Sequence, residues 1–113
     1  MSTQPVPTIT KINLLEKAKS EAFFVVGKLG DVALASAVGN GAFEWQLDDE
    51  VEYHYCVSGT IHYELKYGDQ ALPPIDLNPG ELFIIPAGVS HSGTHPADAV
   101  LLIMERAKPW HAG

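Results

Sequence analysis

Residues 80–95 read GELFIIPAGVSHSGTH, and this stretch decides the predicted fold. The turn Asn78-Pro79-Gly80 leads into an apolar strand over residues 82–85, and a second turn, Pro86-Ala87-Gly88, ends that strand. His91 follows three residues after the second turn. Because two turns and an apolar strand fix the approach of the chain, we expect the His91 side chain to point into a cavity.

The composition indicates a single globular domain. The sequence has 113 residues, of which 46% are hydrophobic, so it can bury a core. Its formal net charge of −7 argues against binding to nucleic acid or to an anionic membrane surface. No apolar run is long enough to span a membrane, residues 1–12 lack the layout of a signal peptide, and Cys56 is the one cysteine. We therefore expect a cytoplasmic protein without an internal disulfide.

The pattern along the chain predicts one domain over residues 11–107, between a flexible N-terminal tail at 1–10 and a C-terminal tail at 108–113. Residues 12–22 have room for one short helix. Turn residues rich in glycine, asparagine and proline separate eight expected strands, at 23–28, 32–38, 42–47, 51–57, 60–67, 72–77, 82–85 and 100–105. Short strands at regular spacing are typical of an all-β antiparallel sandwich or barrel.

The alternation of residue types in the fourth expected strand allows two interpretations. One face carries apolar side chains and the other polar ones: Val51, Tyr53, Tyr55 and Val57 against Glu52, His54, Cys56 and Ser58. In a half-buried sheet the apolar face points inward. In a small barrel with a polar cavity the polar face points inward, and the apolar face packs against flanking chain or a second subunit. The preceding strand alternates in the same way, with Phe43, Trp45 and Leu47 against Glu44, Gln46 and Asp48.

The spacing from Gly80 to His91 resembles the second conserved motif of the cupin superfamily: glycine, five residues, proline, one residue, glycine, two residues, histidine. In the first cupin motif, two histidines precede a glutamate that is followed by a glycine. Glu52 and Gly59 keep the glutamate-to-glycine spacing, whereas the two histidine positions fall on Gln46 and Asp48. The resemblance implies a double-stranded β-helix, or jelly-roll barrel, that holds its site inside. It therefore favours the interpretation in which Glu52 and His54 point inward, and it implies a homodimer.

Among cupins, the sequence resembles 3-hydroxyanthranilate 3,4-dioxygenase, a non-haem iron enzyme. The family's iron ligands fall on Gln46, Glu52 and His91, and its substrate-binding arginines fall on Ala42 and His95. Arg106 is the one arginine of this chain, so a bidentate clamp for a carboxylate is missing. We therefore do not expect cleavage of 3-hydroxyanthranilate.

The candidate metal ligands on these positions are Gln46, Asp48, Glu52 and His91. Such a set predicts a divalent ion, with iron, manganese, nickel and zinc as the candidates. His54 lies two residues after Glu52, about 7 Å along the strand, where it can replace a missing ligand or support Glu52. His54 and His95 are also the candidate catalytic residues, as carriers of protons. We expect His62 on the surface and His111 in the C-terminal tail, and Cys56 as a small buried filler.

Three functions are compatible with these residues. The first is a cupin that binds a divalent metal and acts on a small molecule, with dioxygenase-like or isomerase-like chemistry. The second is a metal-free cupin that binds a small molecule without catalysis. The third is an oligomerising domain without a ligand. For a homodimer, Trp45, Tyr53 and Tyr55 are the expected apolar contact surface.

Overall fold

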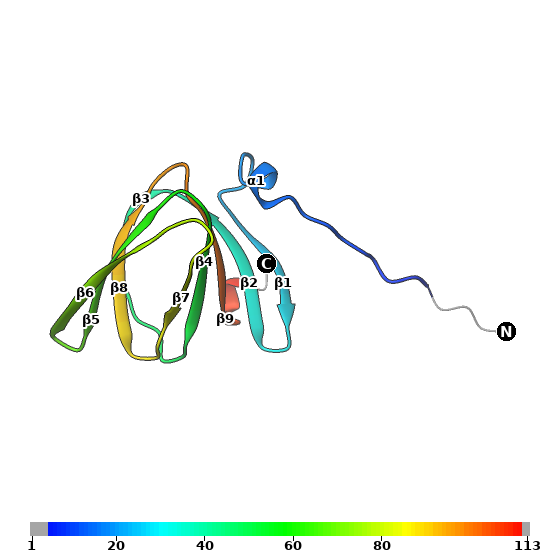
Figure 1. Cartoon of the computed structure of the whole chain (residues 1–113). Coiled ribbons are helices and arrows are strands. Elements are labelled where there is room, and N and C mark those ends of the chain that lie inside the picture. The colour runs from blue at the N-terminus through cyan, green and yellow to red at the C-terminus, as the bar shows by residue number, and fades with distance from the viewer. Residues whose placement is uncertain (1–4, 112–113) are drawn as a thin grey trace.

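Two antiparallel β-sheets face each other in the computed structural model, which describes residues 5–111 (Figure 1). The first sheet has the strand order β1 (Phe23–Leu29), β2 (Val32–Val38), β9 (Val100–Arg106), β4 (Glu52–Ser58) and β7 (Leu82–Ile85). The second has the order β3 (Gly41–Gln46), β8 (Val89–His95), β5 (Ile61–Tyr67) and β6 (Gln70–Leu77). Successive strands cross repeatedly between the sheets, which is the arrangement of a jelly roll. The all-β prediction is confirmed.

Residues 80–95 form β7, a turn and β8. Gly80 and Gly88 have φ angles of +87° and +84°, in the left-handed region that favours glycine. The amide of Gly80 donates to the Cys56 carbonyl at 2.9 Å, which ties the turn before β7 to β4. Beyond Gly88 the chain enters β8, a strand that the sequence analysis did not predict. Its residues include few strong strand formers, and pairing with β3 and β5 on either side gives it its extended form.

The polar face of β4 points into the molecule, as the cupin resemblance predicts. Glu52, His54 and Cys56 are 6%, 4% and 0% exposed, whereas Tyr53 and Tyr55 on the opposite face are each 37% exposed. The usual arrangement of a half-buried sheet is therefore reversed in this strand. Such a reversal is stable only when the inward polar groups find partners.

The strict alternation predicted for the third expected strand is wrong. The register between β3 and β8 shifts between Phe43 and Gln46, so a bulge or irregularity interrupts the pairing. Phe43 and Gln46 then both line the cavity between the sheets, although they lie on opposite faces in a regular strand. Leu47 and Asp48 follow beyond the end of the strand and also line this cavity, although Leu47 is 68% exposed.

The apolar core fills one part of the space between the sheets. Its central contact is between Tyr63 and Phe83, with ring centroids 4.9 Å apart at an interplanar angle of 71°. The other buried residues of this cluster are Cys56, Ile61, Leu65, Leu77, Ile85, Ala99 and Leu101. Pro73 and Pro74 lie in β6, an edge strand, where a missing backbone N–H is tolerated.

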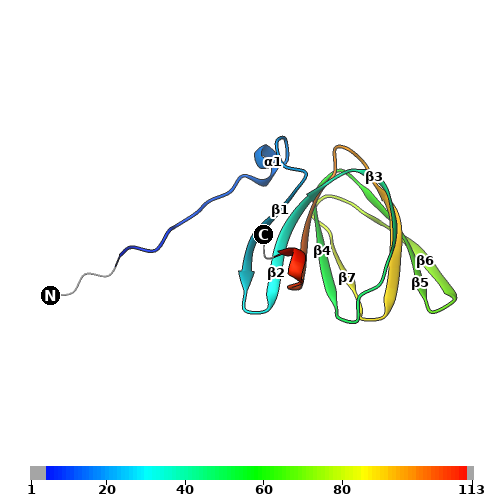
Figure 2. The same ribbon diagram turned by 180° about the vertical axis from the view of Figure 1, so that it is seen from behind.

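The two predicted tails behave differently. Residues 5–10 are exposed and run away from the barrel, and residues 1–4 lie outside the described part (Figure 1). The helix is shorter than the expected 12–22 range, because α1 (Leu14–Lys17) has no buried residue to extend it against the barrel. At the C-terminus, η1 (Pro109–His111) lies against the barrel beside β2, and His111 is only 2% exposed (Figure 2). The C-terminal tail expected from the sequence thus includes a residue that packs against the barrel; residues 112–113 lie outside the described part. No helix among residues 5–111 is long and apolar enough to cross a membrane.

Candidate metal centre and ligand cavity

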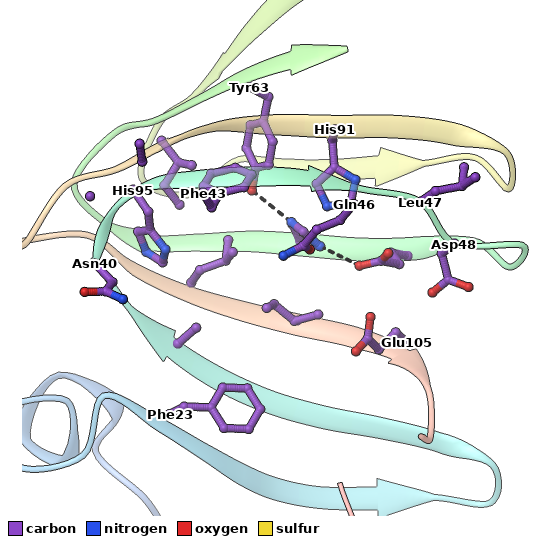
Figure 3. Close-up of a pocket in the computed structure, with 18 of the residues that line it drawn as sticks. Phe23, Asn40, Phe43, Gln46, Leu47, Asp48, Tyr63, His91, His95 and Glu105 are labelled. Atoms are coloured by element: carbon purple, nitrogen blue, oxygen red, sulfur yellow. Dashed lines mark hydrogen bonds and ion pairs between the residues drawn. The ribbon is translucent and has the colours of Figure 1, made fainter. Parts of the chain in front are cut away.

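A cavity of about 540 Å³ lies between the two sheets. Its lining comes from β1 to β5, β8 and β9, together with the C-terminal Lys108. The six predicted metal and catalytic residues all reach it: Gln46, Asp48, Glu52, His54, His91 and His95. Figure 3 shows Asp48 and Glu105 at one end of this cavity and His95 with Asn40 at the other.

Glu52 and His54 on β4 meet His91 on β8 inside the cavity. One ligand atom from each of these buried residues lies within 4.8 Å of the other two. His54 Nε2 is 3.0 Å from Glu52 Oε1, and the His54 and His91 rings meet edge to face with centroids 5.5 Å apart. Two imidazoles and a carboxylate from different strands therefore converge on one point.

Tyr63 fixes the orientation of the His54 ring. The Tyr63 hydroxyl lies 2.8 Å from His54 Nδ1, within hydrogen-bond distance. Burial lowers the pKa of His54 to about 4, so the imidazole is neutral at pH 7. Burial also raises the pKa of the Tyr63 hydroxyl, which keeps its proton. Both ring nitrogens of His54 are thus engaged, one with a phenol and the other with the Glu52 carboxylate.

His91 provides the test of whether these residues suit a metal ion. It is 1% exposed, and its Nδ1 has no hydrogen-bond partner among residues 5–111. Burial and the neighbouring His54 lower the pKa of His91, although Glu52 and Asp48 oppose them. A buried neutral imidazole with a free nitrogen costs free energy unless it gains a partner. Together with the adjacent His54 and Glu52 donors, this free nitrogen fits a bound metal ion.

A second cluster of possible ligands joins Asp48, Glu52 and Glu105, with ligand atoms that also lie within 4.8 Å of one another. Lys108 Nζ is 2.9 Å from Asp48 Oδ2, and His111 Nε2 is 3.3 Å from Glu105 Oε1. Burial alone would raise the pKa of Asp48, but hydrogen bonds from Lys108 and the Glu50 amide hold it below its usual value. Burial and the adjacent Glu52 raise the pKa of Glu105 to about 7. The C-terminal segment therefore supplies counter-charge to this acidic end.

The structure separates the predicted ligands into different groups. Glu52 and His91 lie together with His54, whereas Asp48 lies with Glu105 and is already paired with Lys108. Gln46 faces His91 in the register of β3 and β8 and lines the cavity without belonging to either cluster. His95 lies at the opposite end (Figure 3).

Sequence analysis missed two functional neighbours, Tyr63 and Lys108. Tyr63 lies two residues from Ile61 and from Leu65, which are apolar and share its face of the strand, and that spacing was the signal that could have placed its ring inside. Lys108 gave no local signal, because its contact with Asp48 spans 60 positions of the chain. His62 lies outside the cavity as predicted, with ion pairs to Glu64 and Asp76 on the surface. Cys56 is buried, and burial raises the pKa of its thiol.

Comparison with known proteins gives a fold and no closer assignment. No family model and no curated protein matches the sequence. Among solved structures, the chain is similar to a chain of hydroquinone 1,2-dioxygenase in complex with Cd²⁺ and 4-hydroxybenzonitrile, at 16% identity and TM-score 0.77, over 96% of this chain and 84% of that one. The hydroquinone 1,2-dioxygenase of Sphingomonas sp. TTNP3 with bound 4-hydroxybenzoate matches at 19% identity and TM-score 0.72, over 95% and 85%.

A cupin-2 domain protein from Shewanella frigidimarina matches at 24% identity and TM-score 0.69, over 85% of this chain and 94% of that one. At identities this low, the similarity establishes the fold alone. The two antiparallel sheets and the buried polar face of β4 are those expected of a cupin barrel from the sequence. The chain therefore has the cupin fold that its Gly80–His91 motif predicts.

Proposed function

We propose that this protein binds a divalent metal ion through Glu52, His54 and His91 and presents it to a small molecule in the cavity. The observation that carries the proposal is the convergence of three ligand atoms within 4.8 Å. Two imidazoles and one carboxylate are the donor set of many non-haem iron sites, and the same set accepts manganese, nickel or zinc. In this proposal His54 takes the place of the histidines missing from the first motif, and Asp48 stays with Lys108.

The surrounding residues have separate tasks in this proposal. The bound ion would act as a Lewis acid or as the site of oxygen activation, in dioxygenase-like or isomerase-like chemistry. Tyr63 holds the His54 ring through Nδ1, which leaves Nε2 directed at Glu52. Glu105, whose pKa is raised to about 7 by burial and by Glu52, holds a proton near neutral pH and can exchange it with a ligand. His54 thereby becomes a metal ligand in place of the proton carrier expected from the sequence.

The cavity walls support a small, largely apolar ligand. Phe43, Leu101 and Ile103 are among its lining residues. The dioxygenases of the same fold were solved with 4-hydroxybenzonitrile and 4-hydroxybenzoate, which favours a phenol-like molecule. Arg106 is exposed and paired with Asp31 and Glu50, so it does not offer a clamp for a substrate carboxylate inside the cavity. The lack of 3-hydroxyanthranilate cleavage stays a prediction on this basis.

Metal-dependent melting tests the proposal directly. Protein stripped with a chelator is heated with excess Mn²⁺, Fe²⁺, Ni²⁺ or Zn²⁺, and one of these ions should stabilise the fold. At a hundredfold excess over the dissociation constant the expected gain is about 2.7 kcal/mol. His91→Gln should remove the gain, whereas His62→Gln, at a surface histidine between two carboxylates, should keep it. An unchanged melting temperature with all four ions contradicts the proposal.

A metal-free module for binding small molecules is the second candidate. The observation in its favour is that Tyr63, His54 and Glu52 already satisfy one another without an ion. In that case Gln46→His with Asp48→His should create metal binding where the unchanged protein has none. The third candidate, a domain without any ligand, is disfavoured by a cavity of about 540 Å³ lined with buried polar groups.

We also propose a homodimer, as the family resemblance implies. Tyr53 and Tyr55 on β4 pair in register with Ile84 and Leu82 on β7, and all four are at least 37% exposed. They form an apolar outer surface on the first sheet, of a kind that often becomes an interface. Trp45 lies on β3 in the other sheet, so the predicted contact surface is divided. Sedimentation of the wild type and of Tyr55→Lys tests this: the wild type should be dimeric and the variant monomeric.

A further inference from the structure

The cavity holds one ammonium group beside several carboxylates. Lys108 is the single lysine or arginine that lines it in the described part of the chain, and its side chain is 35% exposed. Asp48, Glu52 and Glu105 line the same cavity, and one carboxylate oxygen of each lies within 4.8 Å of the other two. Carboxyl groups therefore outnumber ammonium groups around this cluster.

The ammonium group of Lys108 already has a partner. Its Nζ donates to Asp48 Oδ2 at 2.9 Å. Burial lowers the pKa of Lys108, but the hydrogen bond to Asp48 and the nearby charge of Glu105 raise it above its usual value. A ligand carboxylate that is to pair with Lys108 must therefore compete with Asp48.

Asp48 is held in place by contacts that do not depend on Lys108. The Glu50 amide donates to Asp48 Oδ1 at 3.0 Å, and the Gly88 amide donates to the Asp48 carbonyl at 2.9 Å. Asp48 is also only 8% exposed. If a ligand took Lys108 away, a buried carboxylate would lose its ion pair, which is costly.

The cavity offers little other positive charge to an anion. Arg106 is not among the lining residues and pairs with Asp31 and Glu50 on the surface. Burial lowers the pKa of His95, which disfavours its charged form. A ligand carboxylate would thus meet like charges without a free cation, whereas an uncharged molecule of the same shape would not.

We propose that Asp48 determines the charge of the ligand: by occupying the Lys108 ammonium group, it makes the cavity favour an uncharged small molecule over an anion of the same shape. This inference names the class of ligand, and it rests on the ligand-binding part of the function proposed above but not on the metal. Because Asp48 acts through Lys108, it is a positioning residue.

Calorimetric titration with two matched phenols tests this selection. The probes are 4-hydroxybenzamide and 4-hydroxybenzoate, which have nearly the same shape and differ in charge at pH 7. Chelator-treated wild type should bind the amide about 10-fold more tightly, because like charges repel the carboxylate. Asp48→Asn keeps an oxygen for the Glu50 amide, removes the charge and frees Lys108. It should raise the affinity for 4-hydroxybenzoate about 10-fold and leave that for the amide unchanged.

Two further variants separate this role from a structural one. Asp69→Asn removes the same formal charge in an exposed turn between β5 and β6 and should behave as wild type. Asp48→Asn combined with Lys108→Met should return the affinity for 4-hydroxybenzoate to near the wild-type value. A loss of packing at Asp48 would instead change the affinity for both probes, and a gain that persists fully without Lys108 overturns the assignment.

The titrations are repeated with Zn²⁺-treated protein, whose melting temperature reports on the metal separately. The gain from Asp48→Asn in both forms, without any effect of Zn²⁺ on melting, supports the role of Asp48 and contradicts the metal proposal. Stabilisation by Zn²⁺ without that gain has the opposite meaning. Equal affinities of the chelator-treated wild type for the two probes overturn the assignment of Asp48 but leave the cavity as a ligand site. No binding of either probe overturns both.

Discussion

The two ends of the cavity satisfy their polar groups in different ways. At the Glu52 end, neighbours from β5 and from the C-terminal segment meet most of the inward polar atoms, through Tyr63, Lys108 and His111. At the other end, Nε2 of His95 is buried and has no hydrogen-bond partner among the described residues. The first end therefore has several possible metal ligands close together, whereas the second leaves a buried imidazole nitrogen unpaired.

This difference also explains why the fold tolerates a reversed β4. Burying a carboxylate and an imidazole is costly when they are isolated, but Glu52 and His54 are within 3.0 Å of each other. The Tyr63 hydroxyl, from the opposite sheet, is within hydrogen-bond distance of His54. Hydrogen bonds among Glu52, His54 and Tyr63 therefore link the two sheets. Substitutions that weaken binding at one end should leave binding at the other end unchanged. The following experiments measure how far the two ends are independent.

The largest expected effect comes from Glu52→Gln. Glu52 belongs to both possible ligand clusters, and the amide removes its charge with little change in shape. Metal affinity should fall by more than about 100-fold, beyond the range usual for residues that only support ligands. Calorimetry with the metal alone measures this loss, and Glu44→Gln on the exposed side of β3 serves as the control. An unchanged affinity would move the metal site away from β4.

Glu105→Gln should alter how stability depends on pH. The pKa of Glu105 is raised to about 7 by burial and by Glu52, against an ordinary value of 4.5. Between these values the folded state binds more protons than the unfolded state, so this carboxyl removes stability as pH rises. The wild type should lose stability relative to the variant by up to about 1.4 kcal/mol per pH unit in this window, and no further above pH 7. Urea unfolding at several pH values between 4.5 and 8 measures this difference; parallel curves contradict it.

Tyr63→Phe tests how much the Tyr63 hydroxyl contributes to metal binding by orienting His54. The variant keeps the ring packed against Phe83 but leaves His54 Nδ1 without its hydroxyl partner. Metal affinity should fall about 10-fold, the lower part of the range for such supporting groups. Calorimetry with the metal alone measures this loss, and an unchanged affinity would show that the Tyr63 hydroxyl does not support His54.

Lys108→Met should have the smallest effect. Asp48 loses its ion pair, but the Lys108 side chain is 35% exposed, so the expected cost in unfolding free energy is about 1 kcal/mol. The pKa of Asp48 should rise toward its usual value, because Lys108 helps to hold it down. Titration followed by NMR measures that pKa, with Lys66→Met on the outer surface near Trp45 as the control.

Local patterns predicted the parts of the molecule that depend on neighbouring residues. The turns at Gly80 and Gly88 and the strand β7 follow from residue type and spacing, whereas the inward face of β4 followed only from the cupin resemblance. The strand β8 was missed because its extended form depends on pairing with β3 and β5, which lie far away in the sequence. The contact of Lys108 with Asp48 was missed for the same reason.

The irregular pairing in β3 had a different cause. Its apolar and polar residues alternate regularly, and that alternation does not indicate the register shift between Phe43 and Gln46. That shift brings an aromatic ring and an amide to the same cavity wall. The sequence had already suggested His54 as a replacement ligand. Only the structure shows that His54, and not Gln46, lies with Glu52 and His91.

The close packing of the C-terminal turn has a practical consequence for purification. His111 Nε2 lies 3.3 Å from Glu105, so a polyhistidine tag fused after residue 113 would begin within a few residues of the acidic end of the cavity. Imidazoles from such a tag could take up the very ions used as probes and report an affinity that belongs to the tag. The N-terminal segment runs away from the barrel, so a tag placed there avoids this artefact (Figure 1).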